Sequence, residues 1–346
     1  MPRFAAHLLQ IAAAALGGWL FHALGIPAAW LSGAVVACVA LSVFGVGLPL
    51  PKPLVDAAML ASGATMGASV TPEAVAAMAR YPASLALLVM GVVAITGGSM
   101  IWLVRVSRWR VGDAMLASVP GAFSTVLAVA TERGVDIGPV AVVQAFRLFL
   151  LITVLPSAVV AVGGDSGRSA MLLGEGLPVA SPVGLSLVLA GGLALGLAFA
   201  RIGMAAPILL GATLASALAH GTGAIPGVVP PVIATAGLVL LGVYVAERFT
   251  TLDRGVLRRT VPAAVASFVI GSALAVAFAV ASAALAGVGL ADALVAFAPG
   301  GLEAMMVLAL VLGLDPLYVG VHHLVRFLGI GFALPLVYTW MRRRGG

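Results

Sequence analysis

Two arginines inside long apolar segments are the residues best placed to do chemistry. Arg147 and Arg326 each lie about nine residues into such a segment, and each follows a polar side chain by three positions, Gln144 in one case and His323 in the other. At the helical rise of ~1.5 Å per residue, each guanidinium would lie roughly 13 Å deep in a membrane. Charges at that depth are costly and almost always face a partner or a water-filled cavity. The two arginines therefore mark a candidate site.

A Pro-Gly pair interrupts the apolar segment that precedes each arginine. The pairs are Pro120-Gly121 and Pro299-Gly300, and Gly301 follows the second pair. Proline removes a backbone donor and clashes with the preceding turn, and glycine frees the backbone, so each segment is predicted to form two half-helices. The second half-helix of each pair would begin with unpaired N–H groups at its positive end. Together with the arginines, these groups predict an anion site, and a small carboxylate suits it because guanidinium binds carboxylate through two parallel hydrogen bonds.

Further polar residues complete the predicted site. Ser124 and Glu303 occupy equivalent places after the two breaks, and a carboxyl present in only one half could couple the site to a proton or a sodium ion. Asp136 and Asp315 stand in Gly-x-Asp turns, where a structural role is expected. The predicted substrate-binding set comprises Pro120, Gly121, Ser124, Gln144, Arg147, Pro299, Gly300, Gly301, Glu303, His323 and Arg326.

Structural interpretations of the same residues remain open. His323 could titrate near neutrality or could serve only as a hydrogen-bonding group between helices. The arginines could pair with nearby acids: Arg147 with Glu132 or Asp136, and Arg326 with Glu303 or Asp315. Histidines and carboxylates do not cluster with the spacing of metal ligands, and Cys38 is the sole cysteine. We therefore expect no metal, no cofactor and no catalytic residue, and hence no enzyme.

The composition places these segments in a lipid bilayer. Hydrophobic residues make up 62% of the 346 positions, charged residues only 9%, and the mean hydropathy is +1.19. A soluble domain carries about 25% charged residues, so this chain could not cover a soluble surface. The net charge of +6 comes from basic residues scattered between apolar runs, which is typical of cytoplasmic membrane loops. We therefore expect no direct binding of nucleic acid.

The chain is predicted to be an internal duplication. Residues 113–121 match residues 292–300 at a shift of 179 positions, and the same shift relates Arg147 to Arg326. The matched residues include rare charged ones, which chance does not easily align. The duplication divides the chain into membrane repeat 1 (1–165), a connecting loop (166–180) and membrane repeat 2 (181–346).

Each repeat contains five predicted spanning helices. They are 4–24, 27–46, 53–70, 82–105 and 138–162 in repeat 1, and 181–201, 205–222, 229–247, 261–287 and 317–340 in repeat 2. If the broken segments 113–134 and 292–313 fold back as hairpins, nearly all basic loops lie on the side of the N-terminus, as the positive-inside rule requires. An odd number of spans then inserts the second repeat upside down. Inverted repeats with broken helices are the architecture of many secondary transporters.

These observations together predict an all-α integral membrane protein of the bacterial inner membrane. It has two inverted repeats of about five spanning helices, each with a helix pair broken at Pro-Gly, and both termini face the cytoplasm. Gly191, Gly192 and Gly196 are predicted to permit close helix packing. The expected partners are the bilayer and a small anionic substrate, and assembly into a homo-oligomer is an open alternative.

The doubled motif resembles that of the membrane AbrB family. Its elements are Pro-Gly, Gly-x-Asp and (Gln/His)-x-x-Arg in each half, together with the segment from Pro27 to Ala34. Members are often named AbrB family transcriptional regulator or putative ammonia monooxygenase, so the resemblance implies a link to gene regulation. The first hypothesis is a secondary transporter of a small organic anion. The second is a membrane-embedded sensor that acts on gene expression indirectly, through a partner protein.

Overall fold

The protein is an all-α membrane protein. The computed structural model describes residues 3–68, 81–121, 123, 126, 129–130, 135–163, 178–204, 206–250 and 252–344. Seven helices in these ranges are long and apolar enough to cross a membrane. They are α1 (Arg3–Ala23), α5 (Tyr81–Arg105), α8 (Ile137–Ala161), α10 (Pro182–Arg201), α12 (Pro231–Ala246) continued to Phe249 by the 3-10 helix η2 (Glu247–Phe249), α13 (Arg254–Ala286) and α16 (Pro316–Arg344). The chain therefore passes through the membrane several times, as predicted.

Three of the predicted spans form shorter helices. They are α2 (Ala29–Val43), α3 (Lys52–Ala68) and α11 (Pro207–Gly221), with 15, 17 and 15 residues. At ~1.5 Å per residue they measure roughly 22 to 26 Å, less than the ~30 Å of a hydrocarbon core. Turns that contain glycine at positive φ bound α2 on both sides, Gly25 at 65° and Gly45 at 79°. Backbone geometry, and not apolarity, therefore sets the length of this helix.

The second Pro-Gly segment contains two short helices, as predicted. α14 (Leu290–Phe297) ends before Pro299, and α15 (Leu302–Val311) begins after Gly301. In the first segment α6 (Val111–Ser118) ends before Pro120, and most of the following half lies outside the described residues. The bounds of α6 and α14 differ by 179 positions, as the duplication predicts. The hairpin arrangement and the inversion of the repeats stay predictions.

The chain forms two compact units. Unit 1 comprises Met1–Met78, Ile152–Thr250 and Glu303–Val319, and unit 2 comprises Ala79–Leu151, Thr251–Leu302 and Gly320–Gly346. Each unit thus combines segments from both predicted repeats, because the division follows packing and not sequence similarity. The repeat boundaries at 165 and 181 stay predictions.

Glycines bring the helices of unit 1 into close contact. α1 packs on α2, and α10 packs on α11. A Cβ added to Gly33 would lie 2.2 Å from the carbonyl oxygen of Gly17, and one added to Gly211 would lie 2.3 Å from the amide nitrogen of Gly196. Such contacts let membrane helices approach at the backbone.

The prediction for the three glycines of α10 is confirmed at two positions. A Cβ on Gly192 or on Gly196 would lie 2.8 Å from a Cα atom of α11. A Cβ on Gly191 would meet only the Cβ of Ala215, at an ordinary 3.7 Å. The prediction is therefore wrong for Gly191, because neighbouring helical residues point about 100° apart and only one of them faces the partner helix.

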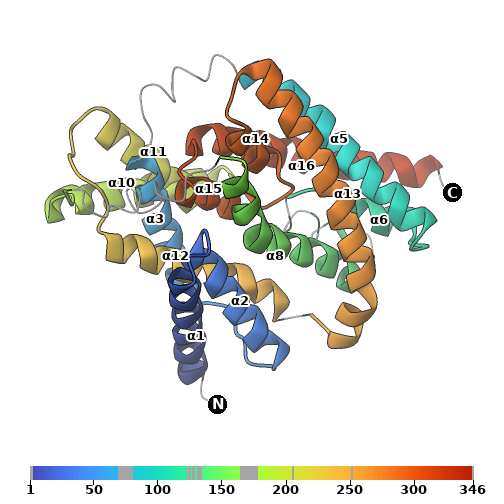
Figure 1. Ribbon diagram of the computed structural model, residues 1–346, viewed down its shortest axis with the longest axis horizontal. Coiled ribbons are helices and arrows are strands. Elements are labelled where there is room, and N and C mark those ends of the chain that lie inside the picture. Colours follow the sequence, from blue (N-terminus) through green and yellow to red (C-terminus); the bar gives the residue numbers. More distant parts are fainter. Residues whose placement is uncertain are drawn as a thin grey trace. The chain divides into compact units, whose positions relative to one another are not determined.

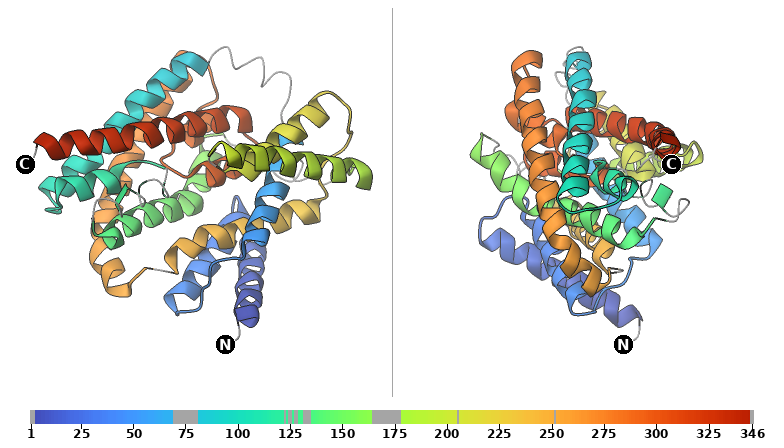
Figure 2. Two further views of the ribbon diagram at one scale, coloured as in Figure 1. Left: turned by 180° about the vertical axis from the view of Figure 1, so that it is seen from behind. Right: turned by 90° about the vertical axis from the view of Figure 1, so that its right-hand side faces the viewer.

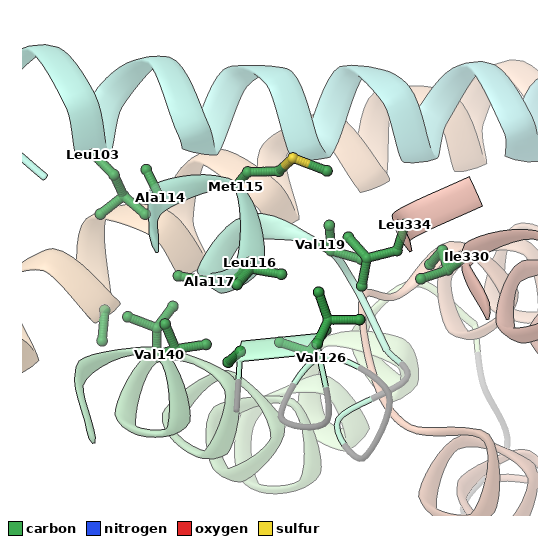
Figure 3. Packing of buried hydrophobic residues seen from close by; sticks show 14 of the residues in the cluster. Leu103, Ala114, Met115, Leu116, Ala117, Val119, Val126, Val140, Ile330 and Leu334 are labelled. Carbon is green, nitrogen blue, oxygen red and sulfur yellow. The ribbon is translucent and has the colours of Figure 1, made fainter. Parts of the chain in front are cut away.

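In unit 2, α5 and α13 lie side by side (Figures 1 and 2), α6 packs on α5, and α14 packs on α13. Figure 3 shows the apolar cluster around α6, to which Leu103, Leu116, Val140 and Ile330 contribute from four different helices. An isolated helix of eight residues is unstable in water, so α6 depends on this packing. The cluster thereby fixes the end of α6 at which the chain breaks.

The predicted topology can be tested by cysteine accessibility. Cys38 is the one cysteine in the sequence, so a Cys38→Ala background removes the only native thiol. Single cysteines at the exposed positions 110 and 258 are expected to react only from the cytoplasmic side. A cysteine at the exposed position 224 is expected to react only from the opposite side. Labelling of all three positions from one side would contradict the inverted-repeat topology.

Candidate functional site at the two helix breaks

Aspartates fix the start of both helices that carry the arginines. Asp136 accepts a hydrogen bond from the amide of Gly138 at 3.1 Å. Asp315 accepts from the amides of Leu317 and Tyr318 at 2.9 and 3.2 Å. A side chain that accepts from the first amides of a helix stabilises its N-terminus. α8 and α16 thus begin 179 positions apart, and the two arginines occupy the same position along their helices.

Arg147 binds the carbonyl end of α6. Its side chain is only 4% exposed. Nη2 donates to the carbonyl oxygen of Val119 at 2.8 Å and to Oε1 of Gln144, and Nη1 donates to the carbonyl oxygen of Ser118 at 3.4 Å. Gln144 itself donates to the carbonyl oxygens of Leu116 and Val119, both at 3.0 Å. These carbonyls lack intrahelical donors because the helix stops before Pro120.

Arg326 binds the carbonyl end of α14 in the same way. Its side chain is 5% exposed. Nη1 donates to the carbonyl oxygen of Ala298 at 2.6 Å, and Nη2 donates to the carbonyl oxygen of Gly300 and to Nδ1 of His323. His323 Nε2 lies 2.9 Å from the carbonyl oxygen of Val295. Since guanidinium can only donate, Nδ1 accepts, and the ring is neutral with its proton on Nε2.

The two halves therefore build one hydrogen-bonding pattern twice. Leu116 and Val295 accept from Gln144 and His323, and each pair is 179 positions apart. Val119 and Ala298 accept from the two arginines at the same shift. Glutamine and histidine can replace each other here, because each accepts from the arginine and donates to a carbonyl oxygen.

The two breaks approach each other within unit 2. Gly121 has φ +76°, and a Cβ at this position would lie 3.3 Å from the carbonyl oxygen of Gly300. The same Cβ would lie 3.4 Å from both Nε and Nη2 of Arg326. The prediction that the breaks meet is thereby confirmed.

The predicted acid partners of the arginines are not observed in the part of the chain that the structure describes. Its one ion pair joins Lys52 to Asp56 on α3, at 2.5 Å. Glu132 and Ser124 lie outside the described residues. Glu303 stands in the first turn of α15, within unit 1. The structural interpretation of the arginines thus changes: they cap helix carbonyls, whose partial negative charge of roughly 0.5 per helix end offsets part of their charge.

His322 belongs to a buried polar cluster that the sequence did not indicate. Its Nε2 lies 2.7 Å from Oγ of Ser84, and that oxygen lies 2.7 Å from Oγ of Ser282. The ring also contacts those of Tyr81 and Phe297, with centroids 5.9 Å apart in both pairs. Ser84 and Ser282 lie in apolar helices, 198 positions apart, and nothing in their local sequence relates them.

Gly121 provides a test of this geometry. Replacement by alanine is expected to destabilise the protein by about 1–2 kcal/mol, because a residue with a Cβ resists this positive φ. The methyl group would also press on Arg326. Gly97→Ala in α5 is the control, since its Cβ would meet nothing within 4 Å, and it is expected to stabilise by about 0.5–1 kcal/mol. Equal thermal unfolding midpoints for the two variants would contradict the described approach of the breaks.

The fold and these contacts define a multi-pass α-helical membrane protein with broken helices and a buried pair of arginines. A family model described as transition state regulatory protein AbrB matches residues 30–342, nearly the whole chain. The chain belongs to the AbrB family. It is also similar to the uncharacterized protein YhjN of Bacillus subtilis (strain 168), with 23% identity over 362 residues that cover 97% of this chain and 93% of the relative.

Proposed function

We propose that this AbrB-family protein transports a small organic anion, which binds between the two helix breaks of unit 2. The observation that supports the proposal is the pair of buried guanidinium groups, which in the described residues contact carbonyl oxygens and neutral side chains only. Buried charges without counter-charge are strongly unfavourable. An anion at the breaks would supply the missing counter-charge.

The orientation of the guanidinium groups also favours a carboxylate. Among the described residues, the contacts of Arg147 and Arg326 engage Nη1 and Nη2 but not Nε. The edge of the guanidinium that carries Nε–H also carries Nη2, which already donates to two acceptors in each arginine. A carboxylate can therefore bind this Nε–H, and it makes two parallel hydrogen bonds when it replaces one acceptor of Nη2. In Arg326 this edge lies beside Gly121, where the lack of a side chain leaves the backbone of the break close to the guanidinium.

The proposed protein resides in the bacterial inner membrane with both termini in the cytoplasm. Binding and release of the anion require no covalent step, so transport involves no enzymatic reaction. Transport also requires no direct contact with nucleic acid. Broken helices whose ends face a ligand at mid-membrane are frequent in secondary transporters.

A second candidate function is an anion sensor. The description of the family as a regulatory protein supports it. In that case the same site would bind the anion without moving it, and a partner protein would carry the signal to gene expression.

Uptake by reconstituted liposomes distinguishes these functions. The purified protein is reconstituted, and labelled mono- and dicarboxylates are offered outside. A transporter is expected to accumulate at least one of them, and liposomes that contain folded Arg326→Gln protein are expected not to. Saturable binding without uptake would favour the sensor. Neither binding nor uptake of any carboxylate would contradict the anion site.

A further inference from the structure

The two adjacent histidines of α16 have opposite capacities to take up a proton. His323 accepts a hydrogen bond at Nδ1 from Arg326 and donates from Nε2 to a carbonyl oxygen. A second proton on this ring would have to bind Nδ1, where it would remove the acceptor and face the guanidinium. His323 therefore cannot bind a proton while Arg326 stays in place.

His322 lies in surroundings that permit either protonation state. Its Nε2 contacts the hydroxyl of Ser84, and that hydroxyl contacts Ser282. A hydroxyl can donate or accept, so both hydrogen bonds can reverse direction when Nε2 gains or loses a proton. All three side chains are 0% exposed, so the hydroxyls take the place of solvent. They belong to α5, α13 and α16, which meet inside unit 2.

The other groups around His322 connect it to the helix break. Tyr81 faces it from α5, and Phe297 faces it from the last turn of α14. Phe297 immediately precedes Ala298, whose carbonyl oxygen binds Arg326. On its own helix, His323 is adjacent, and Arg326 lies one turn further, at a spacing that brings side chains together. A proton on His322 would thus affect anion binding in two ways: its charge acts on Arg326, and the protonated ring packs against Phe297, next to the helix break.

We propose that His322 binds a proton together with the anion, so that the protein is a proton–anion symporter; this inference rests on the proposed function. An anion at the breaks offsets the positive charge of Arg326 and so favours a proton on His322. By thermodynamic linkage, a proton on His322 strengthens anion binding by the same factor. The proton binds a ring nitrogen of His322 and leaves from it, and no other bond changes.

The test is the pH dependence of anion binding between pH 5.5 and 8, where a simple carboxylate stays ionised. Wild-type affinity is expected to rise as the pH falls, by up to about tenfold per pH unit for one linked proton. In His322→Gln, binding is expected to persist with less than about a twofold change over the same range. In liposomes, an inward proton gradient is expected to drive uptake by the wild type but not by this variant.

Two further variants sharpen the test. His323→Gln copies the arrangement around Gln144 and is expected to retain the pH dependence, whatever its absolute affinity. Ser84→Ala removes one hydroxyl but leaves the ring intact, and it is expected to shift the midpoint of the pH dependence. If His322→Gln does not fold, the shift of this midpoint in Ser84→Ala tests the role of His322.

A wild-type pH dependence in His322→Gln, its loss in His323→Gln, or an unchanged midpoint in Ser84→Ala would overturn the role of His322 while leaving the anion site intact. Absence of anion binding to the wild type at every pH would overturn the proposed function itself.

Discussion

Replacement of Arg326 by lysine is expected to leave the protein folded and to weaken anion binding by at least about tenfold. Lysine keeps the positive charge and can donate to one carbonyl oxygen, but it lacks the planar edge that holds a carboxylate by two hydrogen bonds. Loss of one such hydrogen bond to a charged group corresponds to about 1.5–3 kcal/mol, which exceeds the 1.4 kcal/mol of a tenfold change. The measurements are equilibrium binding of a labelled carboxylate and the thermal unfolding midpoint.

Arg326→Gln removes the proposed anion-binding group and also the group that caps the carbonyl end of α14. Glutamine cannot replace all contacts to Ala298, Gly300 and His323, so both binding and some stability are expected to be lost. Arg258→Gln, at an exposed position near the start of α13, is the charge-matched control and is expected to change neither quantity. If both Arg326 variants bind the anion normally, or if both fail to fold, the anion-binding role of Arg326 is refuted.

Gly211→Ala is expected to destabilise unit 1 by about 1–3 kcal/mol or more, because it overpacks a contact between two backbones. The added Cβ would lie 2.3 Å from the amide nitrogen and 2.6 Å from Cα of Gly196, so α10 and α11 would have to separate. Gly191→Ala, on the partner helix, makes only an ordinary contact and is expected to stabilise by about 0.5–1 kcal/mol. Thermal unfolding in detergent measures both.

Similar midpoints for Gly211→Ala and Gly191→Ala would contradict the close packing of α10 on α11. Gly33→Ala offers an independent check, because its Cβ would meet the carbonyl oxygen of Gly17 in the equivalent contact between α1 and α2.

The sequence allowed the membrane class, the broken second segment and the buried arginines to be predicted, because each has a local signature. Apolar length identifies a membrane helix, and Pro299-Gly300 interrupts one. The helix ends were less accessible. The predicted span 27–46 becomes a helix of 29–43, because Phe44-Gly45 turns the chain although it is apolar.

The partners of the arginines could not be predicted from residue types. Acids near Arg147 and Arg326 suggested ion pairs, but the observed acceptors are backbone carbonyls at the ends of α6 and α14. Every residue carries a carbonyl group, so only the end of a helix determines which of them lack a donor. The shared (Gln/His)-x-x-Arg spacing was nevertheless informative, since both side chains of each pair bind the same helix end.

The cluster of His322 with Ser84 and Ser282 required the structure for another reason. Its members come from three helices, and the serines have no equivalent at the repeat shift of 179, where the other site residues match. Long-range packing alone unites them. Ser84 belongs to predicted repeat 1, whereas Ser282 and His322 belong to predicted repeat 2, so the cluster joins residues of both repeats.

The number of anions bound per chain shows whether Arg147 and Arg326 form one site. Since we propose a single site, equilibrium dialysis with a labelled carboxylate is expected to give one anion per wild-type chain. Folded Arg147→Gln and Arg326→Gln proteins should each bind none, and the double variant should be no worse than either. Two anions per wild-type chain, with one left in each single variant, would show two separate sites and contradict the account.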